Sequence, residues 1–242
     1  TADIPTARAI PDRGISYDRK KVELAWNKNE AGTAVPTRAY LSPGFSHLLG
    51  YVSYPAKDKA GNYWQGDFYG LDGLEKQYND LLTGKNGAKI IETDARGKTY
   101  SENIVNAPKQ GTEIITSIDA GIQKEFFALI KNRADESAFA GGAGIIMDVR
   151  NGELLAATSF PEYNSEILSL GEDQETINGY FKDKRKIFLE RDISGLYTPG
   201  SIVKPFFALA ALAEDIIDPA KEILSTGSIA IPNPYFPDQK TI

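Results

Sequence analysis

The sequence predicts an α+β fold, in which helices cover an antiparallel sheet. The first 110 residues are rich in Gly, Tyr, Lys and Asp, with short apolar runs between turn signals, a pattern typical of short strands. Beyond them, the Asn151-Gly152 pair separates two apolar segments, and longer stretches with helical periodicity flank these segments. Ala107–Gly111 is the predicted junction, so we expect one domain over residues 1–110 and another over residues 111–242.

Three elements are predicted before residue 132. Leu71–Leu82 is predicted to be a helix, because apolar residues recur there at helical spacing and Gly84 follows. Thr112–Ile118 alternates enough to predict a strand, and Asp119 is a favourable N-cap for a helix over Ala120–Lys131. The predicted buried stripe of that helix consists of Ile122, Phe126, Leu129 and Ile130.

The second half contains a predicted hairpin and two predicted helices. Gly144–Val149 and Glu153–Thr158 are its strands, since Asn-Gly tolerates the positive φ angles of a tight turn. Helices are predicted over Gln174–Leu189 and Ser201–Asp215. The apolar run Phe206–Ala213 predicts that the last helix is buried deep in a domain core.

Composition excludes several classes of function. The 242 residues carry a formal net charge of −6, which argues against nucleic acid as the main partner because phosphate binding needs a basic patch. The absence of Cys excludes disulfides, thiol nucleophiles and Cys-based metal sites. A single His argues against a His-based catalytic triad and against a multi-His metal site.

The ends of the chain predict that it is part of something longer. It begins with Thr1 rather than Met, and it runs from a proline-rich segment to Ile242 without a closing element. No stretch reaches the roughly 20 apolar residues of a membrane helix. We therefore expect that material was removed upstream and that the C-terminal side is truncated.

Ser201 and Lys204 form an S-x-x-K pair at the start of the last predicted helix. Residues three apart lie on one helix face, so the amine can reach the hydroxyl. Serine is a poor nucleophile without a base beside it, and burial near a helix N-terminus favours a neutral, basic amine. The Ser201 amide would supply half of an oxyanion hole.

An S-x-x-K pair alone is a weak signal. One is expected about once by chance in a chain of this composition. The structural alternative is a Ser that caps the helix and a Lys that faces solvent. However, Ser201 is the only Ser followed by Lys at the third position, and the apolar run after Pro205 favours a core helix.

The surrounding sequence resembles the penicillin-binding proteins. Ser194–Pro205 (SGLYTPGSIVKP) resembles their active-site segment, Gly142–Pro161 the first β-hairpin of their transpeptidase domain, and Gly111–Gln123 the strand and helix that open it. Three upstream blocks resemble the non-catalytic pedestal of the class B, monofunctional members, namely Arg13–Asn27, His47–Tyr51 and Gly70–Gly84. The resemblance covers nearly the whole chain in the family's order.

The resemblance implies a serine acyltransferase of peptidoglycan synthesis, with a pedestal and the N-terminal part of a serine β-lactamase-like transpeptidase domain. By this resemblance, Ser201 is the nucleophile that attacks the terminal D-Ala-D-Ala of a stem peptide, and Lys204 is the general base. β-Lactams are then expected to acylate Ser201 as substrate mimics. Neither a metal nor an organic cofactor is implied. The pedestal blocks and Ile229–Pro237 favour the elongation type.

The family resemblance also implies partners and a location. Its members pair with membrane glycosyltransferases of the rod-shape or division type. They are held by an N-terminal membrane helix, with the catalytic part outside the cytoplasmic membrane, and that helix is not in this chain. A second function therefore stays open, in which the pedestal is a binding module that controls such a glycosyltransferase. A third alternative is an S-x-x-K hydrolase or β-lactam sensor, although those lack the pedestal.

Two departures from the family pattern limit these expectations. The Ser-x-Asn and Lys-Thr/Ser-Gly motifs follow the S-x-x-K segment in the family, and neither has a counterpart in this chain. Since they complete the oxyanion hole and the carboxylate site, the chain alone is expected to be inactive. The segment Asn29–Arg38 is also much shorter than the head region usual in the family.

Other candidate residues have simpler structural interpretations. His47 lies beside apolar residues and is predicted to be a hydrogen-bonded structural residue. A glycosidase site needs two acidic side chains that converge in space, and a sequence does not show such convergence. A phosphate-binding loop needs a following helix that carries Lys-Ser/Thr, and no such helix follows the Gly-rich run. The remaining interpretations are a helix start for Glu172–Glu175, a surface turn for Asp148 and Glu153, a strand entry for Gly141–Gly144, local packing for Tyr54, Tyr63, Trp64 and Tyr69, and a solvated helix face for Lys182–Lys186.

Overall fold

The computed structural model describes residues 6–29, 35–59, 63–93, 99–222, 224, 227, 231–232 and 240–241. The chain divides into two compact units, Thr1–Gly195 and Leu196–Ile242. Because the position of one unit relative to the other is not determined, each is described by itself. The predicted division at residue 110 stays a prediction.

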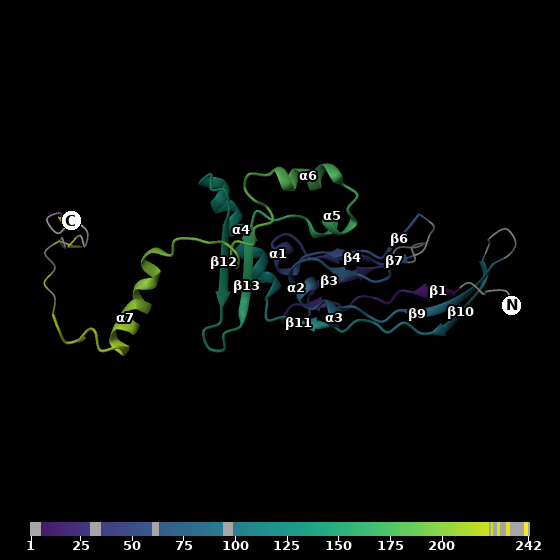
Figure 1. The fold of residues 1–242 in the computed structure, drawn as a ribbon, viewed down its shortest axis with the longest axis horizontal. Coiled ribbons are helices and arrows are strands. Elements are labelled where there is room, and N and C mark those ends of the chain that lie inside the picture. Colours follow the sequence, from purple (N-terminus) through teal and green to yellow (C-terminus); the bar gives the residue numbers. More distant parts are fainter. Residues whose placement is uncertain are drawn as a thin grey trace. The chain divides into compact units, whose positions relative to one another are not determined.

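The first unit combines short strands with helices, as the sequence predicts (Figure 1). Its strands are β1 (Thr6–Ala9), β2 (Ser16–Tyr17), β3 (Glu23–Lys28), β4 (Thr37–Tyr40), β5 (Val52–Ser53), β6 (Ala56–Lys57), β7 (Tyr63–Gln65), β8 (Tyr69–Gly70), β9 (Gly87–Thr93), β10 (Thr99–Asn106), β11 (Ile114–Ile115), β12 (Gly142–Met147) and β13 (Leu154–Phe160). Its helices are α1 (Ser46–Leu49), α2 (Gly73–Gln77), α3 (Asn79–Leu82), α4 (Ala120–Glu136), α5 (Ser165–Leu170) and α6 (Gln174–Lys182).

Two larger sheets organise the N-terminal part of this unit. One has the order β1-β9-β10 and is antiparallel throughout. The other has the order β11-β2-β3-β4, in which β2, β3 and β4 are antiparallel and β11 joins β2 in parallel. β11 is shorter than the strand predicted over Thr112–Ile118, because β2 offers only Ser16 and Tyr17 as partners.

One hydrophobic core joins the second sheet to the residues that follow it. Its buried residues are Leu24, Ala25, Tyr40, Phe45, Leu49, Ile118 and Ala120. Leu154 of β13 packs against the same cluster. The core therefore contains residues from both sides of the predicted junction at Ala107–Gly111, and it ties the start of α4 to the sheet.

The helix predicted over Leu71–Leu82 is present as two short helices. Asp72 is extended and Gly73 has φ +55°, so the helix begins only at Gly73, and it breaks at Tyr78. Of its apolar residues, Leu82 is buried and Leu74 packs against the core, whereas Tyr78 and Leu81 are exposed. Glu75 is also buried, because it has two buried cationic partners, Arg13 and Arg38.

The helix predicted after Asp119 is confirmed, with its cap. The Asp119 carboxylate accepts hydrogen bonds from the backbone N–H groups of Gly121 and Ile122. Of the predicted buried stripe, Ile122 and Leu129 are exposed, whereas Ile130 packs against the cluster that contains Phe127 and Phe160. The buried residues of α4 are Ala120, Gln123, Phe127 and Ala134.

Gln123 explains why a polar residue occupies the buried face of α4. Its amide Nε2 donates to the carbonyls of Gly44 (2.7 Å) and Ala157 (2.6 Å). Its Oε1 accepts from the N–H of Ala157 at 2.8 Å. Because the buried amide makes three hydrogen bonds to the backbone, its burial costs little free energy. The same hydrogen bonds fix α4 to β13 and to the loop before α1.

The predicted hairpin is present, with strands shifted slightly from their predicted bounds. β12 and β13 pair in antiparallel register, with Ile145 opposite Ala157. Figure 1 shows α4 beside this hairpin, and Phe127 of α4 packs with Phe160 of β13. In the turn, Gly152 has φ +80°, and Asp148 accepts from the Arg150 backbone and guanidinium.

The glycines at the entry to β12 have a packing role. A Cβ at Gly144 would lie 2.4 Å from the Phe126 ring, and one at Gly142 would lie 2.9 Å from the Ile130 side chain. Both distances are too short for carbon atoms, so only glycine lets α4 approach the strand this closely. The Gly-rich run is a strand entry, as predicted, that also sets the helix–strand distance.

Residues 183–195, which we call the strap, leave the hairpin region after α6. The helix predicted over Gln174–Leu189 ends at Lys182, because Asp183 is extended and its carboxylate accepts from the Arg185 N–H at 2.8 Å. The run Lys182–Lys186 is therefore a turn rather than a helix face. Within the strap, the side chain of Ile187 is buried.

The second unit contains a 3₁₀ turn, η1 (Gly200–Val203), followed by α7 (Lys204–Ala213). Strands β14 (Ile231–Pro232) and β15 (Lys240–Thr241) pair with each other. The sequence predicted one helix over Ser201–Asp215, and the structure has a 3₁₀ turn in place of its first turn. Short 3₁₀ turns are common at helix ends.

Candidate active site

The segment Pro199–Pro205, which contains the S-x-x-K pair, is held by local backbone geometry. Pro199 has helical φ and ψ, and Gly200 has φ +60°, a conformation that costs glycine little. The N–H of Lys204 donates to the carbonyl of Ser201, which closes the turn. Pro205 lies in the first turn of α7, where no backbone N–H is needed. The positive φ thus falls on a glycine, and the position that needs no backbone N–H falls on a proline.

Ser201 and Lys204 lie one turn apart on this segment. In a 3₁₀ turn, side chains at i and i+3 eclipse each other, so the backbone brings the two side chains onto one side. Both residues are exposed, and within the described part of the chain neither side chain makes a hydrogen bond or ion pair. The arrangement leaves both groups available for reaction, and the first-turn N–H groups have no partner within the helix.

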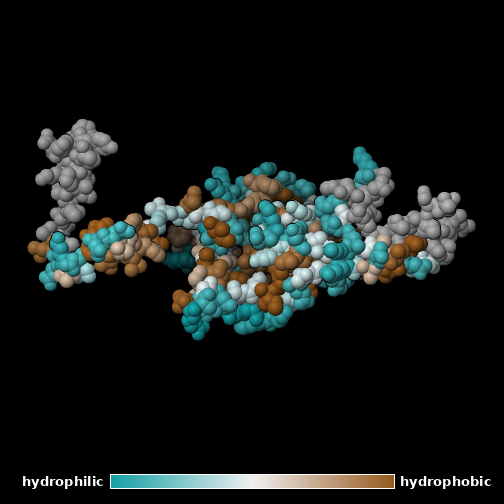
Figure 2. Space-filling model, turned by 60° about the horizontal axis from the view of Figure 1, so that its bottom comes forward, coloured by the Kyte–Doolittle hydropathy of each residue, from teal (hydrophilic) through white to brown (hydrophobic). Residues whose placement is uncertain are grey.

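Helix α7 is exposed, contrary to the prediction of a deeply buried helix. Phe206, Phe207 and Leu209 are 72%, 70% and 65% exposed, respectively. Figure 2 shows hydrophobic atoms along this segment, at the left. Within residues 196–242, no described element covers α7. A helix that is apolar on all sides is typical of a domain interior.

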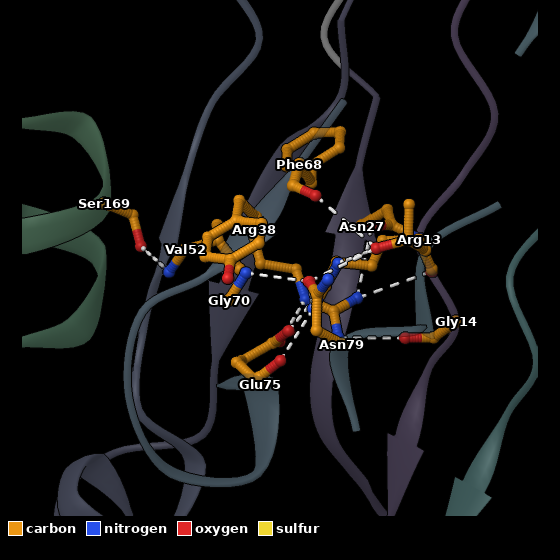
Figure 3. Close-up of polar contacts among 12 residues, drawn as sticks. Arg13, Gly14, Asn27, Arg38, Val52, Phe68, Gly70, Glu75, Asn79 and Ser169 are labelled. Atoms are coloured by element: carbon orange, nitrogen blue, oxygen red, sulfur yellow. Dashed lines mark hydrogen bonds and ion pairs between the residues drawn. The ribbon is translucent and has the colours of Figure 1, made fainter. Parts of the chain in front are cut away.

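A buried ionic network, which the sequence reasoning missed, lies in the first unit (Figure 3). The Glu75 carboxylate accepts from Arg13 Nε at 2.5 Å and from Arg38 Nε at 2.8 Å. All three side chains are at most 1% exposed. Burial lowers the pKa of Arg13, and the adjacent Glu75 carboxylate opposes that effect.

The remaining donors of the two arginines bind neighbouring elements. Arg13 donates to the Thr83 hydroxyl, the Glu75 carbonyl and Asn79 Oδ1, at 2.8, 2.9 and 3.1 Å. Arg38 donates to the Gly14 carbonyl at 2.9 Å and to Asn27 Oδ1 at 3.2 Å. The network therefore joins β3, β4, α2 and α3, and no local sequence pattern indicates that these residues meet.

Contacts after β13 connect the hairpin to α1. Glu162 accepts from the N–H groups of Gly44 (2.7 Å) and Ser46 (3.0 Å), while burial raises the pKa of its carboxyl group. His47 is buried, its Nε2 lies 3.2 Å from the Pro161 carbonyl, and burial lowers its pKa. The prediction of a structural His is confirmed. The Tyr163 hydroxyl donates to Asp72 at 2.9 Å.

Glu190, in the strap, is a side chain whose ionisation should affect stability near neutral pH. Partial burial, together with the Asp192 and Asp72 carboxylates, raises its pKa from 4.5 to about 7. The fold therefore favours its uncharged form, and stability is lost as pH rises through 4.5 towards 7. Burial raises the pKa of Asp192 as well, and its buried Oδ1 has no partner within the described residues.

Glu190→Gln is accordingly expected to stabilise the protein at pH 8 by about 1–2 kcal/mol. This figure is well below the full linkage value, because the half-exposed carboxyl group is partly screened by solvent. At pH 4 the carboxyl group is protonated in both folded and unfolded states, so the variant and wild type should have equal stability. Urea unfolding at the two pH values measures the difference, and an effect independent of pH would contradict the assignment.

Apart from Tyr69 and the run Lys182–Lys186, the other candidates that the structure describes lie where their structural interpretations require. Asp173 caps α6 by accepting from the Thr176 N–H at 3.0 Å, and Asp148 and Glu153 flank the surface turn. Tyr54 packs on Phe68, whereas Tyr69 is exposed. The side chains of Tyr63 and Trp64 lie outside the described residues.

The described residues contain no group of three or more His, Asp or Glu side chains placed to hold a metal ion. They also contain no helix that combines the length and apolar character needed to cross a membrane.

Comparison with known protein families accounts for most of the chain. The family described as "Penicillin-binding Protein dimerisation domain" matches residues 32–116, and "Penicillin binding protein transpeptidase domain" matches residues 142–241. The chain belongs to the penicillin-binding proteins. The transpeptidase match contains the hairpin, the strap and the S-x-x-K segment of this penicillin-binding protein, and the dimerisation match contains β4 and the paired helices α2 and α3.

The curated relatives of this penicillin-binding protein are peptidoglycan enzymes. It is 29% identical over 197 residues to "Peptidoglycan D,D-transpeptidase MrdA" of Haemophilus influenzae, which covers 78% of this chain and 29% of the relative. It is 30% identical over 166 residues to "Peptidoglycan D,D-transpeptidase FtsI" of Buchnera aphidicola, covering 68% and 27%. The chain thus spans less than a third of the length of these relatives.

Solved structures confirm the predicted fold class. The Pseudomonas aeruginosa PBP2 complex with WCK 5153 has a TM-score of 0.70 at 24% identity, covering 98% of this chain and 47% of that chain. The complex between PBP2 and MreC from Helicobacter pylori has a TM-score of 0.65 at 24% identity, covering 94% and 54%. The pedestal and the start of the transpeptidase domain are the parts of this fold that the chain contains.

Proposed function

We propose that the protein is a class B penicillin-binding protein of the elongation type, a serine D,D-transpeptidase that cross-links peptidoglycan stem peptides. The observation that carries the proposal is the S-x-x-K segment on an exposed 3₁₀ turn within a transpeptidase-family match. Ser201 is the nucleophile and Lys204 the general base. Relatives named MrdA support the elongation type, and the division into residues 1–110 and 111–242 is part of the same proposal.

The proposed reaction has two steps at one serine. The Lys204 amine takes the hydroxyl proton as Ser201 Oγ attacks the carbonyl of the penultimate D-Ala. The peptide C–N bond breaks, and the terminal D-Ala leaves with a proton on its new amine. An amine of a second stem peptide then attacks the acyl-serine ester and releases Ser201 Oγ, which recovers its proton.

The chain supplies only part of the machinery for this reaction. The Ser201 N–H is one oxyanion donor, and removal of a single such donor typically costs about 10²–10³-fold in rate. The second donor and the carboxylate site belong to family motifs without a counterpart in this sequence. We therefore propose the activity for the full-length protein, anchored by an N-terminal helix with its catalytic part outside the cytoplasmic membrane.

A second candidate function is supported by the neighbours. PBP2 from Helicobacter pylori was solved in complex with MreC, and another neighbour belongs to a peptidoglycan synthase complex. We propose that the pedestal of this protein docks a membrane cell-wall glycosyltransferase. Ser201→Ala should abolish acylation and leave such binding intact, whereas loss of both in a folded variant would contradict a separate docking role.

Intact-mass spectrometry tests the proposed enzyme. The full-length protein is incubated with benzylpenicillin, whose β-lactam C–N bond opens so that the whole molecule stays attached. One adduct is expected, it should map to the peptide containing Ser201, and it should be absent in Ser201→Ala. A folded full-length protein without an adduct, or with an adduct on another serine, would overturn the assignment.

A further inference from the structure

The sequence contains three Asn-Gly pairs, and the structure places them in three different environments. Asn151-Gly152 lies in the turn of the β12–β13 hairpin, Asn178-Gly179 lies inside α6, and Asn86-Gly87 lies at the start of β9. An Asn before Gly is chemically labile, because no Cβ hinders the Gly nitrogen from attacking the side-chain amide of the Asn. The local structure therefore decides which of the three pairs reacts.

The space around Asn151-Gly152 is open. Both residues are exposed, and the neighbouring Val149 is 93% exposed. A Cβ at Gly152 would meet no atom within 4 Å outside the adjacent residues. Within the described part of the chain, Asn151 Nδ2 makes no hydrogen bond. The side chain of Asn151 is therefore free to turn towards the nitrogen of Gly152.

The hydrogen bonds of this turn favour attack on the Asn151 amide. Asn151 Oδ1 accepts from the Glu153 N–H at 3.0 Å, and a donor at this oxygen stabilises the negative charge that develops there during attack. The Gly152 N–H donates to the Asp148 carbonyl at 2.8 Å, and this bond must open before the nitrogen reacts. Because the turn is exposed to solvent, local opening costs little free energy.

The other two pairs are protected by their surroundings. Asn86 Nδ2, which would be the leaving group, donates to Asp67 Oδ1 at 2.5 Å. Gly87 is buried, and a Cβ there would lie 2.4 Å from the Asn106 carbonyl oxygen, so no space remains for a cyclic intermediate. Gly179 of the third pair lies inside α6, where its N–H belongs to the helical hydrogen-bond pattern and ring closure would break the helix.

We propose that Asn151 is a site of spontaneous deamidation, which converts the hairpin turn into an aspartyl or isoaspartyl turn. The Gly152 nitrogen loses its proton to hydroxide and attacks Asn151 Cγ. The N–Cγ bond forms, the Cγ–Nδ2 bond breaks, and Nδ2 takes up a proton from water and leaves as ammonia. Water then opens the cyclic imide at either of its carbonyls and leaves a free carboxylate. This inference does not depend on the proposed function.

The isoaspartyl product changes the hairpin itself. Its main chain runs through the side-chain carbon, so one atom is added between residues 151 and 152. The Gly152 N–H then no longer fits the Asp148 carbonyl, and the Asp148 N–H, which donates to the Glu153 carbonyl at 2.9 Å, lies at the same turn. Deamidation therefore disturbs the end of the hairpin, whereas the pair Ile145–Ala157 lies further along the strands.

Peptide mapping by mass spectrometry tests the proposal on the full-length protein, incubated at pH 8 either folded or in guanidinium chloride. In the folded protein, Asn151 should deamidate at least about tenfold faster than Asn86 and Asn178. In guanidinium chloride the three rates should agree within about threefold, because only the sequence then decides them. An Asn151 that reacts no faster than Asn86 or Asn178 in the folded protein would overturn the proposal.

The products and one variant test the chemistry. Opening of a cyclic imide gives both aspartate and isoaspartate at position 151, whereas direct hydrolysis of the amide gives aspartate alone. A product without isoaspartate would therefore contradict the proposed route. Asn151→Gln would have to close a larger ring, so the conversion of amide to acid at this position should disappear, and conversion at the wild-type rate in this variant would also overturn the proposal.

Discussion

Glu75→Ala is expected to lower the free energy of unfolding by about 3–5 kcal/mol, the usual cost of removing one partner from a buried ion pair. Arg13 and Arg38 would then face each other with no anion between them, and both are 0% exposed. Their remaining hydrogen bonds hold them in place, so neither side chain reaches solvent without breaking contacts to α3 and β3. Urea unfolding followed by far-UV circular dichroism measures the loss.

Two further variants define this effect. Glu75→Gln keeps the shape and the acceptor oxygen but removes the charge, so its destabilisation should lie between wild type and Glu75→Ala. Lys131→Ala removes one partner of the exposed pair Lys131–Asp135 and should cost less than about 0.5 kcal/mol. A loss for Glu75→Ala as small as that for Lys131→Ala would show that the network contributes little to stability.

Lys204→Ala should have the largest effect on function, a fall of about 10²–10⁴-fold in the acylation rate of the full-length protein, because a general base contributes that much. Lys204 is exposed and makes no hydrogen bond or ion pair in the described part of the chain. The melting temperature is therefore expected to stay near that of wild type. Stopped-flow acylation with a chromogenic β-lactam measures the rate.

Lys204→Arg distinguishes proton transfer from charge. Arginine keeps the positive charge but stays protonated in proteins, so this variant should be as slow as Lys204→Ala if the amine acts as a base. Lys221→Ala changes an exposed lysine of the same unit and serves as the matched control. A Lys204→Arg variant that acylates at close to the wild-type rate would show that Lys204 acts through its charge.

The pattern of local residues predicted the elements that depend on neighbours in sequence. Asp119 caps α4 through N–H groups two and three residues away, and Gly152 takes a positive φ in the hairpin turn. Ser201 and Lys204 lie one turn apart, so the placement of both side chains on the same side of the turn also depends only on neighbouring residues. Such features need only a few consecutive residues, which explains why they were predicted correctly.

Predictions that required a buried face were less successful. Gln123 is buried in α4, where apolar periodicity indicated Leu129 instead, and Glu75 is buried in α2 among apolar residues. Each polar side chain is buried because distant segments supply its partners, Arg13 and Arg38 for Glu75 and the backbone of β13 for Gln123. Periodicity measures apolar content and contains no information about such long-range partners.

By itself, the sequence determined the α+β class, the helix cap, the hairpin and the S-x-x-K segment, because short-range geometry and residue chemistry decide these. Only the tertiary structure decided which helix faces are buried and why Gly142 and Gly144 must be glycine. The physical reason is that desolvation of a polar group becomes tolerable only when folding brings partners from distant segments within hydrogen-bonding distance.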